Sequence, residues 1–181
     1  ASSMKNSILI GNIIVAFTTS IYLLLIGLFD LLPTTFEANQ TVMGIHFSIL
    51  FDYAVFTFII AFLIELVSDI ENTKGDTSQG LSTLAVVIGF SKAKNTVLTL
   101  SLIPILCVVY YLKVYLFDAK LLYSFIYGLI FIVTPLIYFS IKIFKANEPK
   151  EFRHLNIILK CILFFAYLSI FVISLNIQNH A

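Results

Sequence analysis

The chain has little charge, little cysteine and no tryptophan. Only 12% of its 181 residues are charged and the net charge is +1, whereas a soluble domain is usually about one quarter charged. No basic stripe exists, which excludes nucleic acid as a partner. The two cysteines lie inside apolar runs, so neither a disulfide framework nor a cysteine metal site is expected. The remainder is 60% hydrophobic, with a mean hydropathy of +1.01, as in a protein embedded in membrane lipid.

Long apolar runs predict five membrane-spanning helices, because a bilayer-crossing helix needs about 20 apolar residues. The fold class is therefore an all-α polytopic membrane helical bundle, formed by a single membrane domain. The expected spans cover residues 8–29, 45–67, 97–116, 121–144 and 155–177 of the domain 1–181, with a polar loop at 68–95. Pro104 and Pro135 fall inside the third and fourth spans and predict kinks there. A short apolar patch within the loop, 84–90, is expected to lie at the membrane interface.

The distribution of Lys and Arg predicts an orientation. Outside the fifth span, the N-terminal flank and the loops after the second and fourth spans hold eight basic residues, and the other side holds two. Basic loops usually stay inside the cell. The polar loop is therefore expected on the cytoplasmic side of a plasma (inner) membrane.

Polar side chains of the kind that bind hard cations lie at and beyond the end of the second span. Glu65, Asp69, Asn72 and Asp76 are spaced by four, three and four residues, so one continuous helix would stack them on one face. Carboxylates at a membrane helix end usually meet a cation. Oxygen ligands suit Mg²⁺, which commonly shares its coordination between carboxylates and phosphate oxygens. The pattern therefore indicates a Mg²⁺-bound diphosphate, with Lys74 close enough to contact phosphate.

Plainer interpretations stand beside this one. The acidic stretch can be a solvated helix end, and Lys74 can simply neutralise it. Glu65 lies one turn deeper, where it binds metal, orients a basic residue, meets an acceptor substrate, or only hydrogen-bonds a neighbouring helix. Asp52 lies near the other end of the second span and is either a proton-relay group or a paired interfacial carboxylate.

The acidic pattern resembles the second aspartate-rich motif of the UbiA-type membrane prenyltransferases, D-x-x-D-x-x-x-D followed by G-x-x-T-L-P and a later Gly. In this chain the motif stands as Asp69, Asn72 and Asp76, then Gly80, Thr83-Leu84-Ala85 and Gly89. A segment with Lys5, Gly11-Asn12 and Ala16 is similar to the start of the family's fifth helix. The resemblance covers essentially the whole chain, which would be the C-terminal part of a nine-helix fold, helices five to nine. The chain starts with Ala1, and residues 1–5 resemble the tail of a preceding helix, so an N-terminal half is expected as a partner.

The resemblance implies a Mg²⁺-dependent enzyme that transfers a prenyl group from a prenyl diphosphate to a lipid-soluble acceptor. The acceptor would be an isoprenoid lipid or a quinone-type molecule, since the Glu-x-x-x-Asp-x-Glu pattern resembles geranylgeranylglycerol-phosphate synthase-like members of the family. The implied residues are Glu65, Asp69 and Asp76 for catalysis, Lys5, Asn12 and Lys74 for substrate, and Asp69, Asn72 and Asp76 for the metal. Without that role, Lys5 would anchor the chain at the interface and Asn12 would hydrogen-bond within its helix.

Three positions depart from the family pattern. Ile64, Ser68 and Asn72 stand where the family usually has Arg, Lys and a carboxylate. The family's first aspartate-rich motif does not occur in these 181 residues. Two alternatives therefore stay open: an ion-coupled transporter or channel subunit that uses Glu65 and Asp52, and a truncated homologue without catalytic activity.

Overall fold

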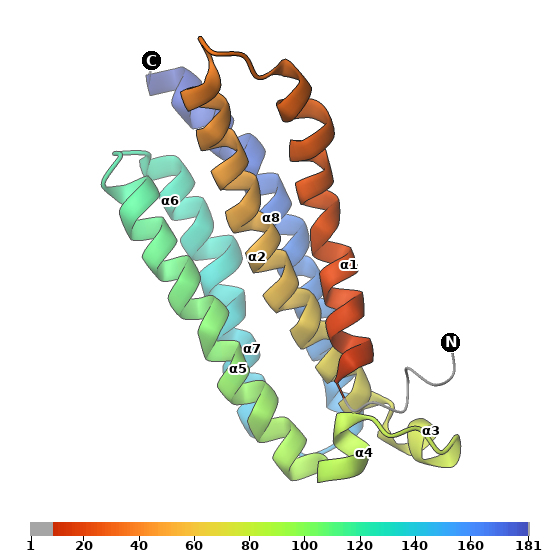
Figure 1. Ribbon diagram of the computed structural model, residues 1–181. Helices are drawn as coiled ribbons and strands as arrows, with labels where there is room; N and C mark the ends of the chain where they lie inside the picture. Colours follow the sequence, from red (N-terminus) through yellow and green to blue (C-terminus); the bar gives the residue numbers. More distant parts are fainter. Residues whose placement is uncertain (1–8, 181) are drawn as a thin grey trace.

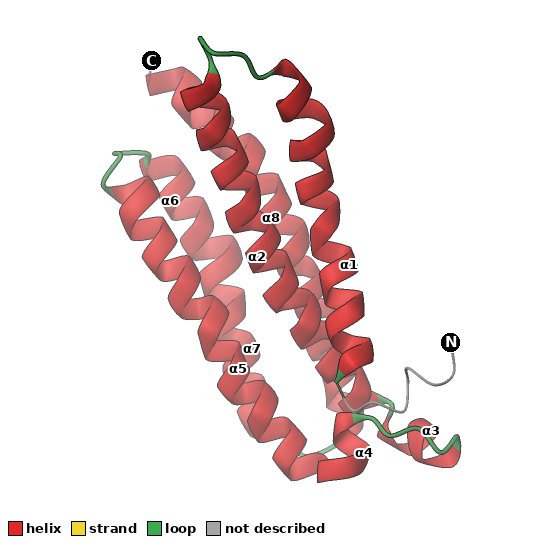
Figure 2. Ribbon diagram, viewed as in Figure 1, coloured by secondary structure: helices red, strands yellow, loops and turns green. Residues whose placement is uncertain are grey.

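The protein is a bundle of long helices. The structure, a computed structural model, describes residues 9–180, and within them every regular element is helical (Figure 1, Figure 2). Five helical segments are long and apolar enough to cross a membrane: Ile10–Thr34, Gln40–Glu71, Phe90–Phe117, Leu122–Lys145 and Pro149–Asn176. The expected all-α membrane bundle with five transmembrane helices is confirmed.

The elements have the following bounds. The first hairpin consists of α1 (Ile10–Ile26), a π-helical continuation (Gly27–Leu31), a short 3-10 turn (Leu32–Thr34) and α2 (Gln40–Glu71). Two short helices, α3 (Thr73–Ser78) and α4 (Leu84–Ile88), lead into α5 (Phe90–Tyr111) and its π-helical end (Leu112–Phe117). The last two spans are α6 (Leu122–Gly128), a π segment (Leu129–Val133) and α7 (Thr134–Lys145), then a 3-10 turn (Pro149–Glu151) and α8 (Phe152–His180).

The long helix α2 lies at the centre of the arrangement, in contact with α1, α5 and α8 (Figure 1). One end of the bundle carries α3, α4 and the start of α1, and is called the motif end below. The opposite end carries the α1–α2 connection, the turn between α5 and α6, and the end of α8. The polar motif and the two connecting turns are therefore at different ends of the bundle.

Apolar side chains at helical spacing build the core. On α2 the buried residues Ile60, Leu63, Val67 and Ile70 recur every three or four positions, which marks one packed face. They belong to one core cluster with buried side chains of α5, α7 and α8, among them Phe139. Lipid tails are as apolar as these side chains, so close van der Waals packing stabilises the contacts between helices.

Helix α1 joins the bundle chiefly through α2. Only two α1 side chains are buried, Ala16 and Ser20, which are small residues one turn apart. Small residues let two membrane helices approach closely. Gly27, just beyond α1, extends this contact, because a Cβ at that position would lie 2.9 Å from the Phe47 ring.

The two prolines are accommodated differently. Pro135 lies at the start of α7 and follows the π segment, where the Thr134 backbone N–H donates to the Leu129 carbonyl. The Thr134 hydroxyl donates to the same carbonyl at 2.9 Å. A π segment with side-chain hydrogen bonding is a common way to accept proline in a membrane helix. Pro104, in contrast, lies inside the continuous helix α5.

The segment expected to be a polar loop is mostly helical. Helix α2 continues to Glu71 and α5 begins at Phe90, with α3 and α4 between them. Charged residues do not stop a helix that has left the membrane, because water solvates them. The apolar patch forms α4, whose residues Leu84 and Ala85 are buried as part of the core cluster.

Candidate functional site

Asp69 lies in the last turn of α2, beside the first turn of α1. The Asn12 side-chain amide donates a hydrogen bond of 2.8 Å to Asp69 Oδ2. Both residues are half-buried. The sequence analysis connected them with two separate motifs, 57 residues apart, and the structure brings the two side chains into contact.

Asp76 lies on α3 and is tied to the start of α4. The Thr83 hydroxyl donates to Asp76 Oδ2 at 3.2 Å, and the backbone N–H of Leu81 donates to the Asp76 carbonyl at 2.9 Å. The turn between them needs Gly80, whose φ of +66° is strained for a residue with a side chain. The next backbone N–H after Thr83, that of Leu84, interacts with the Asp69 carboxylate. Residues 83 and 84 therefore connect both carboxylates to one chain segment.

The four-residue stripe does not lie on one continuous helix, and that expectation is corrected. Helix α2 ends at Glu71, and Asn72 separates it from α3 with φ −93° and ψ 6°. The Thr73 hydroxyl donates to the carbonyls of Asp69 and Ile70, a local bond that competes with the regular helix. Asp69 and Asp76 still interact electrostatically across this break.

The other predicted site residues lie around these two carboxylates. Asn72 and Lys74 are exposed to solvent. No hydrogen bond or ion pair joins Lys74 to another side chain within residues 9–180. Lys5 lies outside the described residues. Ile64, at the position of the family's Arg, packs against the apolar core.

Glu65 lies one turn deeper on α2 and is half-buried. The opposite charge that acts on it is Lys160 of α8, and the negative charge of Glu65 also acts on Asp69. Glu65 and the exposed Lys160 are therefore near enough for their charges to interact, without an ion pair between them among the described residues.

Helix α8 contributes a second polar residue that the sequence analysis missed. Asn156 is buried, and its amide donates to the Ser68 hydroxyl at 2.6 Å. Its carbonyl oxygen is buried without a hydrogen-bond partner among the described residues. Asn156 and Lys160 are four residues apart, so they lie on one face of α8, and polar residues at that spacing inside a span were the available signal.

The donor set fits a metal that is shared with a substrate. Within the part of the chain that the structure describes, no three His, Cys, Asp or Glu side chains come together as a metal site. Two carboxylates are too few for an all-protein Mg²⁺ site, but Mg²⁺ in phosphate-handling enzymes often takes only one or two and completes its shell with phosphate and water. Asp69 and Asp76 match that second arrangement.

No protein-family model, no curated protein and no solved structure matches this chain. The inference of function therefore rests on the chemistry of the motif end.

Proposed function

We propose that the motif end binds the diphosphate of a prenyl diphosphate through Mg²⁺, and that the chain is part of a UbiA-type membrane prenyltransferase. The observation that carries the proposal is the contact between Asn12 and Asp69. The hairpin of α1 and α2 already places the start of α1 beside the end of α2, and within it the hydrogen bond joins the two residues that resemble two different motifs of one family. Their meeting at the same end of the bundle as Asp76 supports a common site.

Each residue has a defined role in this proposal. Asp69 and Asp76 hold the metal, and the exposed Asn72 between them can add its carbonyl oxygen. Asn12 and Thr83 fix the two carboxylates through their hydrogen bonds. The exposed Lys74 approaches the phosphate oxygens. Bound Mg²⁺ would neutralise the charge that develops on the diphosphate as it leaves.

The position of the site suits a substrate with a charged head and an apolar tail. Ile13 and Phe17 follow Asn12 on α1 and are exposed, in a segment apolar enough to cross a membrane. A prenyl tail can lie along this surface while the diphosphate stays at the polar helix ends. The acceptor is proposed to be a lipid or quinone-type molecule that reaches the same end through the membrane.

The motif end is proposed to face the cytoplasm of the plasma membrane, as its lysines indicate. One of these lysines is also structural: Lys94 donates to the Ala146 carbonyl at 2.9 Å and stabilises the C-terminal end of α7. The first aspartate-rich motif of the family would be supplied by an N-terminal half.

The test is binding of geranylgeranyl diphosphate to the purified chain in detergent, with Mg²⁺ and with EDTA. We expect Mg²⁺-dependent binding that disappears in an Asp69→Ala/Asp76→Ala variant. Glu71→Ala is the matched control, because it removes a neighbouring carboxylate that has no assigned role. Binding that survives the double substitution would contradict the proposal.

Other results would favour the alternatives. Binding that appears only after an N-terminal half is added would identify the missing part of the site. No binding in either form would favour the transporter, in which Glu65 and Asp52 couple to a proton or sodium gradient, or a truncated homologue without activity.

A further inference from the structure

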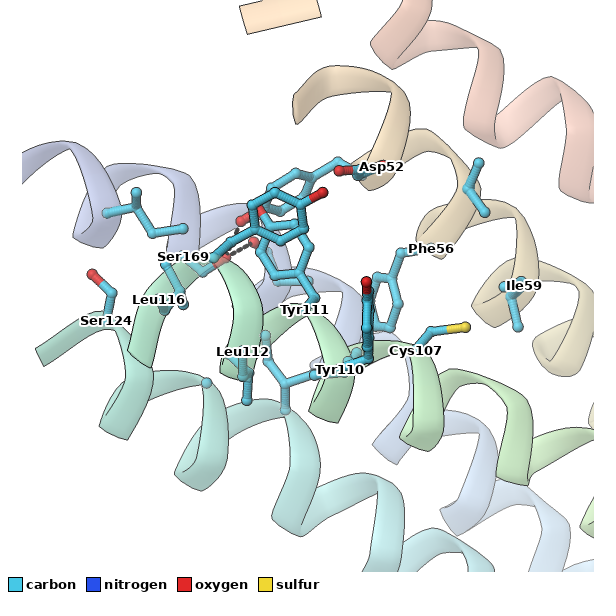
Figure 3. A pocket seen from close by; sticks show the side chains of 18 of the residues that line it. Asp52, Phe56, Ile59, Cys107, Tyr110, Tyr111, Leu112, Leu116, Ser124 and Ser169 are labelled. Carbon is cyan, nitrogen blue, oxygen red and sulfur yellow. Dashed lines mark hydrogen bonds between the residues drawn. The ribbon is translucent and has the colours of Figure 1, made fainter. Parts of the chain in front are cut away.

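A second candidate site lies in the half of the bundle away from the motif end. It is a cavity of about 400 Å³ between α2, α5, α6 and α8 (Figure 3). This volume falls within the usual range of small-molecule sites. None of the motif residues lines it, so it is distinct from the proposed diphosphate site.

Asp52 is the one charged residue among those that line the cavity. No ion pair or hydrogen bond joins its carboxylate to another side chain in the described range 9–180. Asp52 is twelve residues into α2, which starts at Gln40, so it lies about 18 Å along the helix from that end. A carboxylate within a membrane-spanning helix is costly unless a positive group meets it, which makes it a marker of function.

Tyrosines line the same cavity as this carboxylate. Tyr111 lies close enough to interact electrostatically with Asp52, and its ring centroid is 4.8 Å from that of Tyr115. Figure 3 shows Asp52, Tyr111 and Ser169 gathered at one side of the cavity. Ser169 is itself occupied by a hydrogen bond with the Tyr53 hydroxyl, at 2.5 Å. Aromatic faces are electron-rich and attract cations.

The cavity opens at the outside of the bundle, on segments apolar enough to cross a membrane. Tyr110 and Tyr115, which line it, are both more than half exposed on a helix that spans the membrane. The walls are otherwise mainly apolar, for example Phe56 and Ile59. A ligand would therefore enter from the membrane and would carry an apolar body.

A further acceptor lies behind the cavity wall. Ser124 lines the cavity and accepts a hydrogen bond of 3.0 Å from the Asn176 amide. The Asn176 carbonyl oxygen is buried without a partner among the described residues. This oxygen lies behind the cavity wall, and the Asp52 carboxylate lines the cavity itself.

We propose that this cavity binds a lipid-soluble organic monocation, an amine with a long apolar chain, with its ammonium group beside Asp52. An anion is excluded because no basic side chain lines the cavity. A divalent metal ion would need more oxygen ligands than one carboxylate. A neutral chain would fill the apolar part but leave the carboxylate unpaired. An alkylammonium satisfies the carboxylate, the aromatic faces and the apolar walls together.

The absence of tryptophan allows a direct test. A Phe56→Trp substitution places a single tryptophan in the cavity wall, and 11-bromoundecylamine quenches its emission on contact. In detergent, we expect half-maximal quenching at a concentration about tenfold lower for this amine than for the neutral 11-bromoundecanol. Asp52→Asn in the same background should abolish that preference, and Asp52→Glu should retain it.

A second reporter separates binding from partitioning into the micelle. Phe171→Trp, exposed on α8 and not in the cavity wall, should show equal quenching by the amine and the alcohol. Equal quenching of the Phe56→Trp reporter by both compounds would overturn the proposal, as would a preference that survives Asp52→Asn. If Asp52→Asn does not fold, competition settles the question with Asp52 intact: unlabelled dodecylamine must displace the bromoamine better than dodecanol does.

Discussion

At the scale of single residues, the contact between Asn12 and Asp69 could not be derived from helical periodicity. Periodicity relates residues a few positions apart, and these two are 57 apart on different helices. The resemblance to a family suggested both residues, and two consecutive spans put the start of α1 near the end of α2, but nothing in the sequence paired these two side chains. The polar residues Asn156 and Lys160, in contrast, were visible as exceptions inside an apolar span.

The first prediction concerns Asn12. Asn12→Ala removes the donor that orients the Asp69 carboxylate, and we expect Mg²⁺-dependent diphosphate binding to weaken about fivefold to tenfold, as for loss of a partly solvated hydrogen bond to a charged group. Thr19→Ala is the control, because the Thr19 hydroxyl bonds only to a carbonyl of its own helix. Calorimetric titration gives both dissociation constants, and equal values for the two variants would contradict a positioning role for Asn12.

The second prediction concerns Glu65 and Lys160. Lys160→Met should lower stability in the presence of Glu65 but have a smaller effect in a Glu65→Gln background. The expected coupling is about 0.6 kcal/mol, the average for polar pairs between membrane helices. Unfolding in SDS provides the four values of the mutant cycle. Lys113→Met, which removes a distant exposed lysine, should show no coupling to Glu65.

At the scale of helices, the sequence predicts the number of membrane-spanning helices. It does not predict where those helices are interrupted. Apolar runs of membrane length admit few alternatives to a helix, because a chain in lipid must satisfy its own backbone. The division between α2 and α3 at Asn72, and the π segments, depend on hydrogen bonds of particular side chains, such as the Thr73 and Thr134 hydroxyls. Such bonds have no signature in hydropathy.

A third prediction compares two glycines of the first hairpin. Replacing a helical Gly by Ala usually adds about 0.5–1 kcal/mol of stability. At Gly44 a Cβ would meet no atom within 4 Å, so Gly44→Ala should raise the SDS midpoint. At Gly27 the Cβ would lie 2.9 Å from the Phe47 ring, so Gly27→Ala should lower the midpoint. Equal shifts in the same direction would show that α1 and α2 do not pack closely at Gly27.

At the scale of the whole molecule, the bundle has a more loosely attached helix. The hydrophobic window of the α1 span is 17% buried, against 33% for that of α2. Helix α1 nevertheless supplies Asn12, so the candidate site depends on the membrane span with the smallest buried share. The sequence indicated five similar spans and could not distinguish this one, because lipid-facing and buried apolar residues have the same hydropathy.

A fourth prediction concerns the orientation of the bundle. In a Cys107→Ala/Cys161→Ala background, a cysteine placed at Ser78 should react with a membrane-impermeant maleimide only in inverted vesicles. A cysteine at Glu37, in the connection between α1 and α2, should react only in intact cells. Both positions are exposed, so accessibility differs only by membrane side. The reverse pattern would place the motif end outside the cell.

The length of α2 implies a hydrophobic mismatch. Its 32 residues extend about 48 Å, whereas the hydrocarbon core of a bilayer is about 30 Å thick. A tilt of about 20° shortens the vertical span by only a few ångströms, so α2 must protrude from the bilayer. The last turn of α2 then stands at the level of the lipid headgroups, and its height above the acyl chains changes with bilayer thickness. The length of the lipid acyl chains would thus change how far a membrane-anchored substrate must rise from the acyl chains to reach Asp69.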